Sequence, residues 1–94
     1  MRNIRSSRKT QTFQRLVKRQ AFKKGARDLV QGLGFRSDYE SWGEADQYTY
    51  ERGRRFAAML RRAGVAWDGV SRFPDHAQDW VYENANDVVG ELNV

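Results

Sequence analysis

The scarcity of aliphatic residues limits most strongly what this chain can fold into. Only nineteen of its 94 residues are Leu, Ile, Val or Phe, a share close to the level at which chains fail to bury a core. Three Trp and four Tyr residues compensate in part, because each aromatic ring buries a large apolar area. The length allows one compact domain, and we expect its core to be thin, with aromatic rings supplying part of it.

The composition also excludes several protein classes. The sequence contains no cysteine, which excludes a disulfide scaffold, thiolate metal sites and a cysteine nucleophile. Its apolar runs are far shorter than the roughly 20 residues of a membrane-spanning helix. The basic residues at the start are followed by no apolar stretch, unlike those of a secretory signal. We therefore expect a soluble, cytoplasmic protein.

Charge is segregated along the chain. Residues 1–36 carry eleven Lys or Arg residues and a single acid, Asp28, which gives a net charge of +10. Residues 63–94 carry six acids against Arg72, which gives a net charge of −5. A segment as basic as the first attracts polyanions over a screening distance of about 8–10 Å. The alternative is a solubilising arm, although an arm that is disordered alone can still bind nucleic acid.

Apolar residues recur at helical spacing in three segments, and no segment of useful length alternates as a strand would. The pattern predicts helices over about 10–31, 41–63 and 74–90, preceded by a flexible basic arm at residues 1–9. We therefore predict an all-α fold, a small three-helix domain. Its expected core consists of Leu16, Val17, Trp42, Phe56, Leu60, Trp67, Trp80, Val81 and Val88.

Local signals mark the ends of these helices. Ser41–Glu44 fits the S-x-x-E capping box, and Ser37–Glu40 fits it one turn earlier. Gly64 stands where a left-handed cap would end the second helix, and Pro74 suits the first position of the third. Gly25, inside the first predicted helix, indicates a bend, a close helix crossing or simple tolerance.

Two segments 28 residues apart share the pattern aromatic-x-basic-Gly-x-Arg. The first runs from Phe22 to Arg27 and the second from Tyr50 to Arg55. Each places a glycine one helical turn after an aromatic residue, which lets another backbone approach the helix closely. A chance echo in an arginine-rich chain is the alternative explanation.

These segments resemble elements of the ribosome modulation factor family. The members of that family are short basic bacterial proteins. That family carries an A-x-x-x-G…G element in one helix and an aromatic-x-x-G-x-x-x-A element in the next. Ala21–Gly25 with Gly32 after it is similar to the first, and Tyr50–Ala57 is similar to the second. The resemblance covers about residues 18–60 and does not extend to the helix at 74–90. It implies two helices that bind ribosomal RNA and hold ribosomes in an inactive dimer.

The basic N-terminal third is the candidate nucleic-acid site. Lys and Arg neutralise phosphates, and an aromatic ring within a basic face can stack on an unpaired base. Phe22 falls on the same side of the first predicted helix as Arg15 and Arg19, although it could instead belong to the core. We predict a non-catalytic nucleic-acid-binding protein that prefers RNA slightly over DNA, with the ribosome as a candidate partner. The predicted site residues are Arg2, Arg5, Arg8, Lys9, Arg15, Lys18, Arg19, Phe22, Lys23, Lys24, Arg27, Arg54 and Arg55.

Catalysis and metal binding have few candidate residues. His76 is the only histidine and stands beside an acid at an expected helix start. Acids at positions 75, 79 and 83 follow one side of the third predicted helix, which is typical of a solvated face rather than a metal site. We therefore expect no enzymatic activity, no cofactor, no metal and no small-molecule substrate. Membrane contact is also not expected, because the apolar face of the first helix lacks Trp and a long Leu run.

The second hypothesis is a protein-interaction module, such as a phage-type inhibitor of a host nucleoprotein machine. The acidic surface of the third predicted helix would dock a basic partner or the chain's own basic arm. Its residues are Asp75, Asp79, Tyr82 and Glu83. Charge reversal on the basic and the acidic surface would separate the two hypotheses. Neither hypothesis specifies an oligomeric state.

Overall fold

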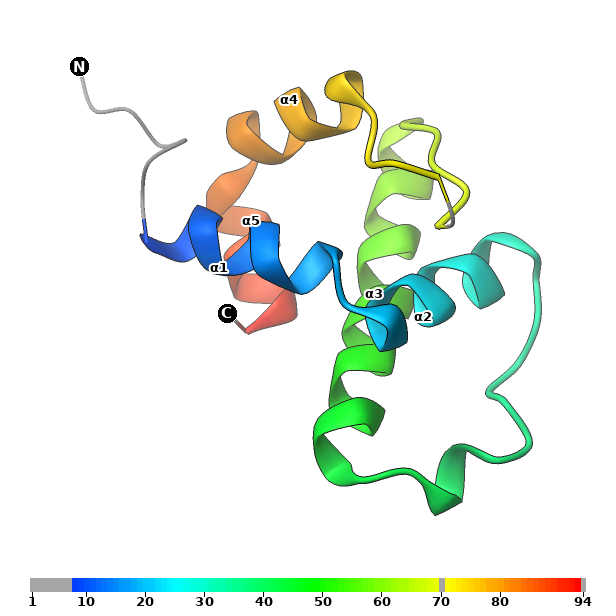
Figure 1. Cartoon of the computed structure of the whole chain (residues 1–94). Helices are drawn as coiled ribbons and strands as arrows, with labels where there is room; N and C mark the ends of the chain where they lie inside the picture. The colour runs from blue at the N-terminus through cyan, green and yellow to red at the C-terminus, as the bar shows by residue number, and fades with distance from the viewer. Residues whose placement is uncertain (1–7, 70, 94) are drawn as a thin grey trace.

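The computed structural model describes residues 8–69 and 71–93, and every regular element in this part of the chain is a helix. The helices are α1 (Arg8–Val17), α2 (Gln20–Val30), α3 (Glu44–Ala63), α4 (Asp75–Glu83) and α5 (Ala85–Leu92), with a 3₁₀ turn, η2 (Tyr39–Ser41), before α3. In Figure 1 α2 lies across α3, while α1, α4 and α5 lie to one side of them. The prediction of an all-α fold is confirmed. Residues 1–7 of the predicted arm lie outside the described residues, and its last two positions belong to α1, which begins at Arg8.

Two of the three predicted helices are each divided into two shorter helices. The first breaks after α1, where Arg19 takes an extended backbone conformation with ψ of 140°. This break turns α2 relative to α1, so that Phe13 and Phe22 both enter the core with their ring centroids 6.3 Å apart. The third breaks at Asn84, whose side-chain amide donates a hydrogen bond to the Trp80 carbonyl at 2.9 Å. Asn side chains compete in this way with the backbone bonds that would continue a helix.

The predicted start of the second helix is wrong, whereas its predicted end is confirmed. Helix α3 begins at Glu44 with Gly43 as its N-cap and without a side-chain capping bond. Ser41 lies in η2 instead, and its hydroxyl donates to the Asp38 carbonyl at 2.6 Å. Gly64 caps the other end of α3 in the left-handed conformation with φ of 74°. Pro74 is the N-cap of α4, one position before the predicted one.

Aromatic rings form the centre of the core, as the composition predicts. Phe13, Phe22, Phe56, Trp67 and Phe73 make a continuous cluster with ring centroids 5.0–6.5 Å apart. Such spacings are typical of tilted and edge-to-face pairs, which add to the energy of area burial. The prediction of the core omitted Phe13, Phe22 and Tyr50, which are fully buried, and included Trp42 and Trp80, which are only half-buried.

The echoed glycines meet where α2 crosses α3. A Cβ atom on Gly25 would lie 2.0 Å from the Tyr50 carbonyl oxygen, and a Cβ atom on Gly53 would lie 2.0 Å from that of Phe22. Gly25 therefore contacts Tyr50, three positions before Gly53, and Gly53 contacts Phe22, three positions before Gly25. Of the explanations for Gly25, a close helix crossing is confirmed. This reciprocal contact gives the repeated pattern a structural role, because only glycine allows the two backbones to approach so closely.

Candidate nucleic-acid interface

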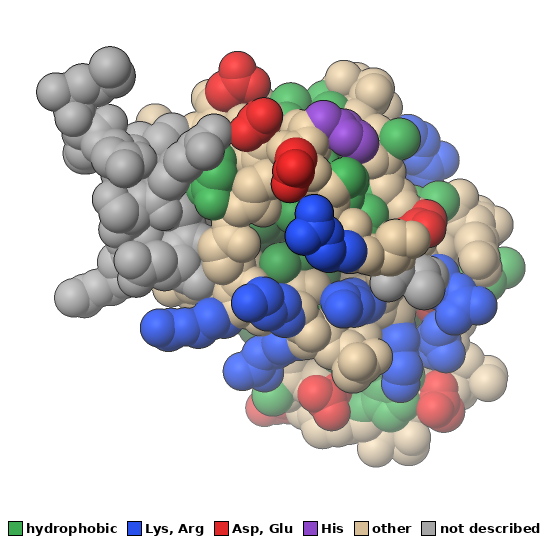
Figure 2. Space-filling view, turned by 45° about the horizontal axis from the view of Figure 1, so that its top comes forward, with side chains coloured by type: hydrophobic (Ala, Val, Ile, Leu, Met, Phe, Trp, Pro, Cys, Tyr) green, Lys and Arg blue, Asp and Glu red, His purple; other side chains and the backbone are tan. Residues whose placement is uncertain are grey.

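Helices α1 and α2 and the link between them carry six of the thirteen basic side chains that the structure describes. Arg15, Lys18 and Arg19 lie exposed around the end of α1. Lys24 and Arg27 lie exposed on α2, and the neighbouring Lys23 is half-buried. In Figure 2 the Lys and Arg side chains form a band across the face that is shown, with Asp and Glu side chains mainly above and below it. Such a band of one sign attracts a polyanion such as a nucleic-acid backbone.

Some predicted site residues cannot be placed in this band. Arg2 and Arg5 lie outside the described residues, as do the side chains of Arg8 and Lys9. The prediction for Phe22 is wrong, because the side chain is 0% exposed and its ring packs against Phe56 at 5.7 Å. A fully buried ring cannot stack on a base.

The predicted arginines of α3 have different environments. Arg54 donates through Nη2 to the Leu33 carbonyl at 2.9 Å, and its guanidinium lies 4.9 Å from the centre of the Phe35 ring. It therefore holds the segment between α2 and η2 against α3. Arg55 is exposed and lies on the side of α3 away from Gly53 and its contact with α2, as the helical period of 3.6 residues requires. The structure thus does not bring Arg55 together with the basic residues of α2.

A buried carboxylate organises the segment that follows α2. Asp28 is 3% exposed and accepts two hydrogen bonds from Arg36, from Nε at 3.0 Å and from Nη2 at 3.2 Å. The Tyr50 hydroxyl donates a third, at 2.6 Å. The bond to Asp28 is the main cause that raises the pKa of Arg36, while burial is the main cause that raises the pKa of Tyr50. A buried carboxylate needs such partners, and these fix Arg36 beside α2.

Two adjoining hollows lie along this part of α2. The smaller, of about 270 Å³, is lined by Gln20, Lys23, Lys24, Arg27, Arg36 and Gly69. The larger, of about 690 Å³, runs from Arg27 along Gln31 to the segment from Leu33 to Asp38. Arg27 and Arg36 line both hollows, so the two lie next to each other at these side chains. The smaller hollow has the chemistry of an anion site, because four of its lining residues are Lys or Arg and none is Asp or Glu.

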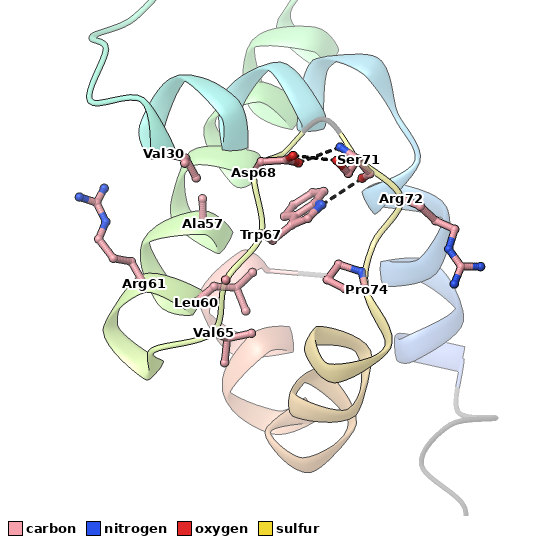
Figure 3. A pocket seen from close by; sticks show the side chains of 11 residues that line it. Val30, Ala57, Leu60, Arg61, Val65, Trp67, Asp68, Ser71, Arg72 and Pro74 are labelled. Atoms are coloured by element: carbon pink, nitrogen blue, oxygen red, sulfur yellow. Dashed lines mark hydrogen bonds between the residues drawn. The ribbon is translucent and has the colours of Figure 1, made fainter.

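A third hollow has an apolar lining. It has a volume of about 550 Å³ and lies between the end of α2, α3 and the segment 65–74. Figure 3 shows Val30, Leu60 and Val65 around it and the side chains of Arg61 and Arg72 extending away on opposite sides. Its polar groups bond mainly to one another: the Trp67 indole donates to the Ser71 carbonyl at 3.1 Å, and Asp68 accepts from the Ser71 amide at 2.7 Å. The hollow therefore suits an apolar group.

The predicted acidic surface belongs mainly to α4. Asp75, Asp79 and Glu83 are exposed, and Asp75 lies 3.8 Å from Arg72. Tyr82 is half-buried and its hydroxyl accepts a hydrogen bond from Gln14 of α1 at 3.0 Å. That bond and a second one from Gln78 tie Tyr82 to its own domain.

Residues 8–69 and 71–93 contain no group of three or more His, Asp or Glu side chains placed to hold a metal ion. None of its helices is both long enough and apolar enough to span a bilayer. His76 lies with Nε2 3.1 Å from the Ala66 carbonyl oxygen, which links α4 to the preceding segment.

Comparison of the chain with models of protein families, with curated proteins and with solved structures found no match.

Proposed function

We propose that this chain is a non-catalytic nucleic-acid-binding protein that prefers RNA and binds it with the face formed by α1 and α2. One observation supports the proposal: Lys23, Lys24 and Arg27 line one hollow beside α2, and Arg15, Lys18 and Arg19 lie exposed at the end of α1 and just before α2. A binding site for a single small anion would not need charge over this length. A polyanion would contact both helices at once.

The ribosome is the first RNA target to test, because the resemblance to ribosome modulation factor covers both helices of the glycine crossing. In this proposal the crossing of α2 and α3 is the rigid support, and the basic side chains of α2 extend from it. The chain would then act in the cytoplasm, where ribosomes are found. Its acidic helix α4 would lie away from the bound RNA.

The salt dependence of binding tests the proposal. We would measure binding to labelled structured RNA, single-stranded DNA and duplex DNA over a salt series. Neutralising Lys23, Lys24 and Arg27 by substitution with Gln should weaken binding to all sequences. It should also lower the slope of log K against log salt by about 2, since each lost contact with a single strand contributes about 0.7.

Arg55→Gln is the matched control for Arg27→Gln, because each removes one exposed positive charge. The proposal requires that Arg27→Gln weaken RNA binding more than Arg55→Gln does. Weak binding to all three nucleic acids that vanishes near about 150 mM salt would contradict the proposal.

A protein-interaction module is the second candidate, and the apolar hollow favours it. An apolar hollow of about 550 Å³ beside Val30, which is 46% exposed, can receive a large apolar side chain of a partner. A phage-type inhibitor of a host nucleoprotein machine would use such a surface together with α4. If reversal of Asp79 and Glu83 abolished activity while reversal of the basic face did not, this candidate would replace the first.

A further inference from the structure

The two neighbouring hollows along α2 differ in chemistry in a way that matches the two parts of a nucleotide. The smaller hollow presents Lys23, Lys24 and Arg27, which suit a phosphate. The larger hollow is lined by Phe35 together with the polar side chains of Gln31 and Ser37. A phosphate site and an aromatic site therefore adjoin across Arg27.

Phe35 is unusual among the rings of this protein because 54% of it is exposed. Its ring lies edge-on to Tyr39 and Tyr50, with centroids 4.9 and 5.5 Å apart, and Arg54 lies 4.9 Å from its centre. Leu33, two positions before Phe35, is 51% exposed as well, so this segment leaves two large apolar side chains uncovered in a chain with few apolar residues. The neighbours of Phe35 hold its ring in place, so it is presented as a fixed platform.

The backbone around Phe35 is fixed as well. The bonds from Arg36 to buried Asp28 hold the chain directly after it, and the bond from Arg54 to Leu33 holds the chain before it. A ligand that binds Phe35 would thus find the segment already ordered, and little conformational entropy would be lost on binding. This preorganisation distinguishes Phe35 from an exposed ring on a free loop.

From these observations we propose that the two hollows bind an unpaired nucleotide of an RNA chain, with its base stacked on Phe35 and its phosphates at Lys23, Lys24 and Arg27. The inference rests on the proposed function, because it assigns the substrate class of that same basic face. Stacking on an aromatic ring requires a base that is free of its duplex partner. Asp38, which lines only the larger hollow, repels phosphate and so favours a phosphate position at the lysines.

The ligand is a nucleotide within a chain rather than a free nucleotide. Arg15, Lys18 and Arg19 lie exposed at the end of α1 and just before α2, and none of them lines either hollow. Flanking nucleotides would contact these side chains. A free mononucleotide would use only the hollows and would bind far more weakly.

The test compares two RNA hairpins that differ only by one bulged 2-aminopurine, using the full chain. Wild type should bind the bulged hairpin more tightly and quench the 2-aminopurine fluorescence. Phe35→Ala should weaken binding of the bulged hairpin about 5- to 100-fold and abolish the quenching. It should change binding of the fully paired hairpin less than about twofold, since that RNA offers only its backbone.

Two further variants serve as controls. Phe35→Trp should retain tight binding and quenching, because it keeps an aromatic platform. Val30→Ala removes another exposed apolar side chain, one that lines neither hollow, and should leave both affinities unchanged. Thermal unfolding of each variant verifies the fold.

The outcomes test separately whether the chain binds nucleic acid and whether the two hollows bind a nucleotide. If neither hairpin binds at physiological salt, the proposed function itself fails. If both hairpins bind equally and Phe35→Ala weakens neither, nucleic-acid binding stands and the nucleotide site is overturned. If AMP alone displaces the bulged hairpin at a concentration close to the Kd of the hairpin, the assignment to an RNA chain is overturned in favour of a free nucleotide.

Discussion

Substitution of Gly25 by alanine tests the helix crossing most directly. The new Cβ atom would lie 2.0 Å from the Tyr50 carbonyl oxygen, whereas carbon–oxygen contacts in proteins are about 3.3 Å or longer. Helices α2 and α3 would have to separate by more than about 1 Å. A gap of about that size removes a quarter to a half of the dispersion energy of the contacts across it, and these include the Phe22–Phe56 pair.

The expected change in stability follows from two opposing effects. Overpacking of a core costs about 1–3 kcal/mol and sometimes more, and here the obstacle is backbone, which has no alternative rotamer. Alanine favours the helix itself by about 1 kcal/mol over glycine. With the overpacking cost at the upper end of that range, about 3 kcal/mol, we expect a net loss of about 2 kcal/mol in the free energy of unfolding. That loss would lower Tm by about 8–16 °C in a domain of this size.

Thermal unfolding followed by circular dichroism measures the effect, with Gly90→Ala as the matched control. Gly90 lies within α5, and a Cβ atom there would meet nothing within 4 Å, so this change should raise stability by up to about 1 kcal/mol. The combination of Gly25→Ala with Gly53→Ala should cost less than the sum of the two, because one separation of the helices relieves both clashes. The reasoning is refuted if Gly25→Ala unfolds at the wild-type Tm or above it.

Three further predictions concern the polar groups near the crossing. Tyr50→Phe should lower the free energy of unfolding by about 1–3 kcal/mol, since it removes one of the bonds to buried Asp28; equal stability of the variant in urea unfolding would contradict this role. The pKa of Tyr50 is raised above its ordinary value of 10.0 in the folded state. The contribution of Tyr50 to stability is therefore complete below pH 10 and is lost as the pH rises through the raised pKa. Urea unfolding over a pH series should show this loss in wild type, whereas a similar alkaline loss in Tyr50→Phe would assign it to another group. Finally, the hydrogen bond to Glu51 raises the pKa of Tyr39 to about 12, so ultraviolet titration should show one tyrosine that ionises late. Glu51→Gln should return the pKa of Tyr39 toward 10.0. An unchanged titration of this variant would exclude that bond.

The helical class and several local features followed from the sequence because they depend on short-range physics. Apolar spacing predicted helices in the segments where the structure has them, and Gly64 ends α3 in the predicted left-handed conformation. The composition predicted a core of aromatic rings. The Ser41 capping box did not form, because the same serine bonds locally within η2.

The candidate site was predicted only in part, and Phe22 shows why. On one continuous helix over 10–31, Phe22 shares a side with the basic residues of α1. The break at Arg19 ends that register and turns Phe22 into the core. Phe35 had no sequence signal of its own, since a lone aromatic in a loop is as compatible with burial as with exposure.

What the sequence by itself determined is the all-helical character, the segregation of charge and the aromatic composition of the core, since each depends on residue type and spacing along the chain. The tertiary structure alone decided which faces of the helices meet. Gly25 and Gly53 allow α2 and α3 to cross at close range, and that crossing buries Asp28 against Tyr50. Through Asp28 and Arg36 it also orders the segment that presents Phe35. Periodicity shows that a helix has an apolar side, but only contacts between distant segments establish what covers that side and what remains exposed.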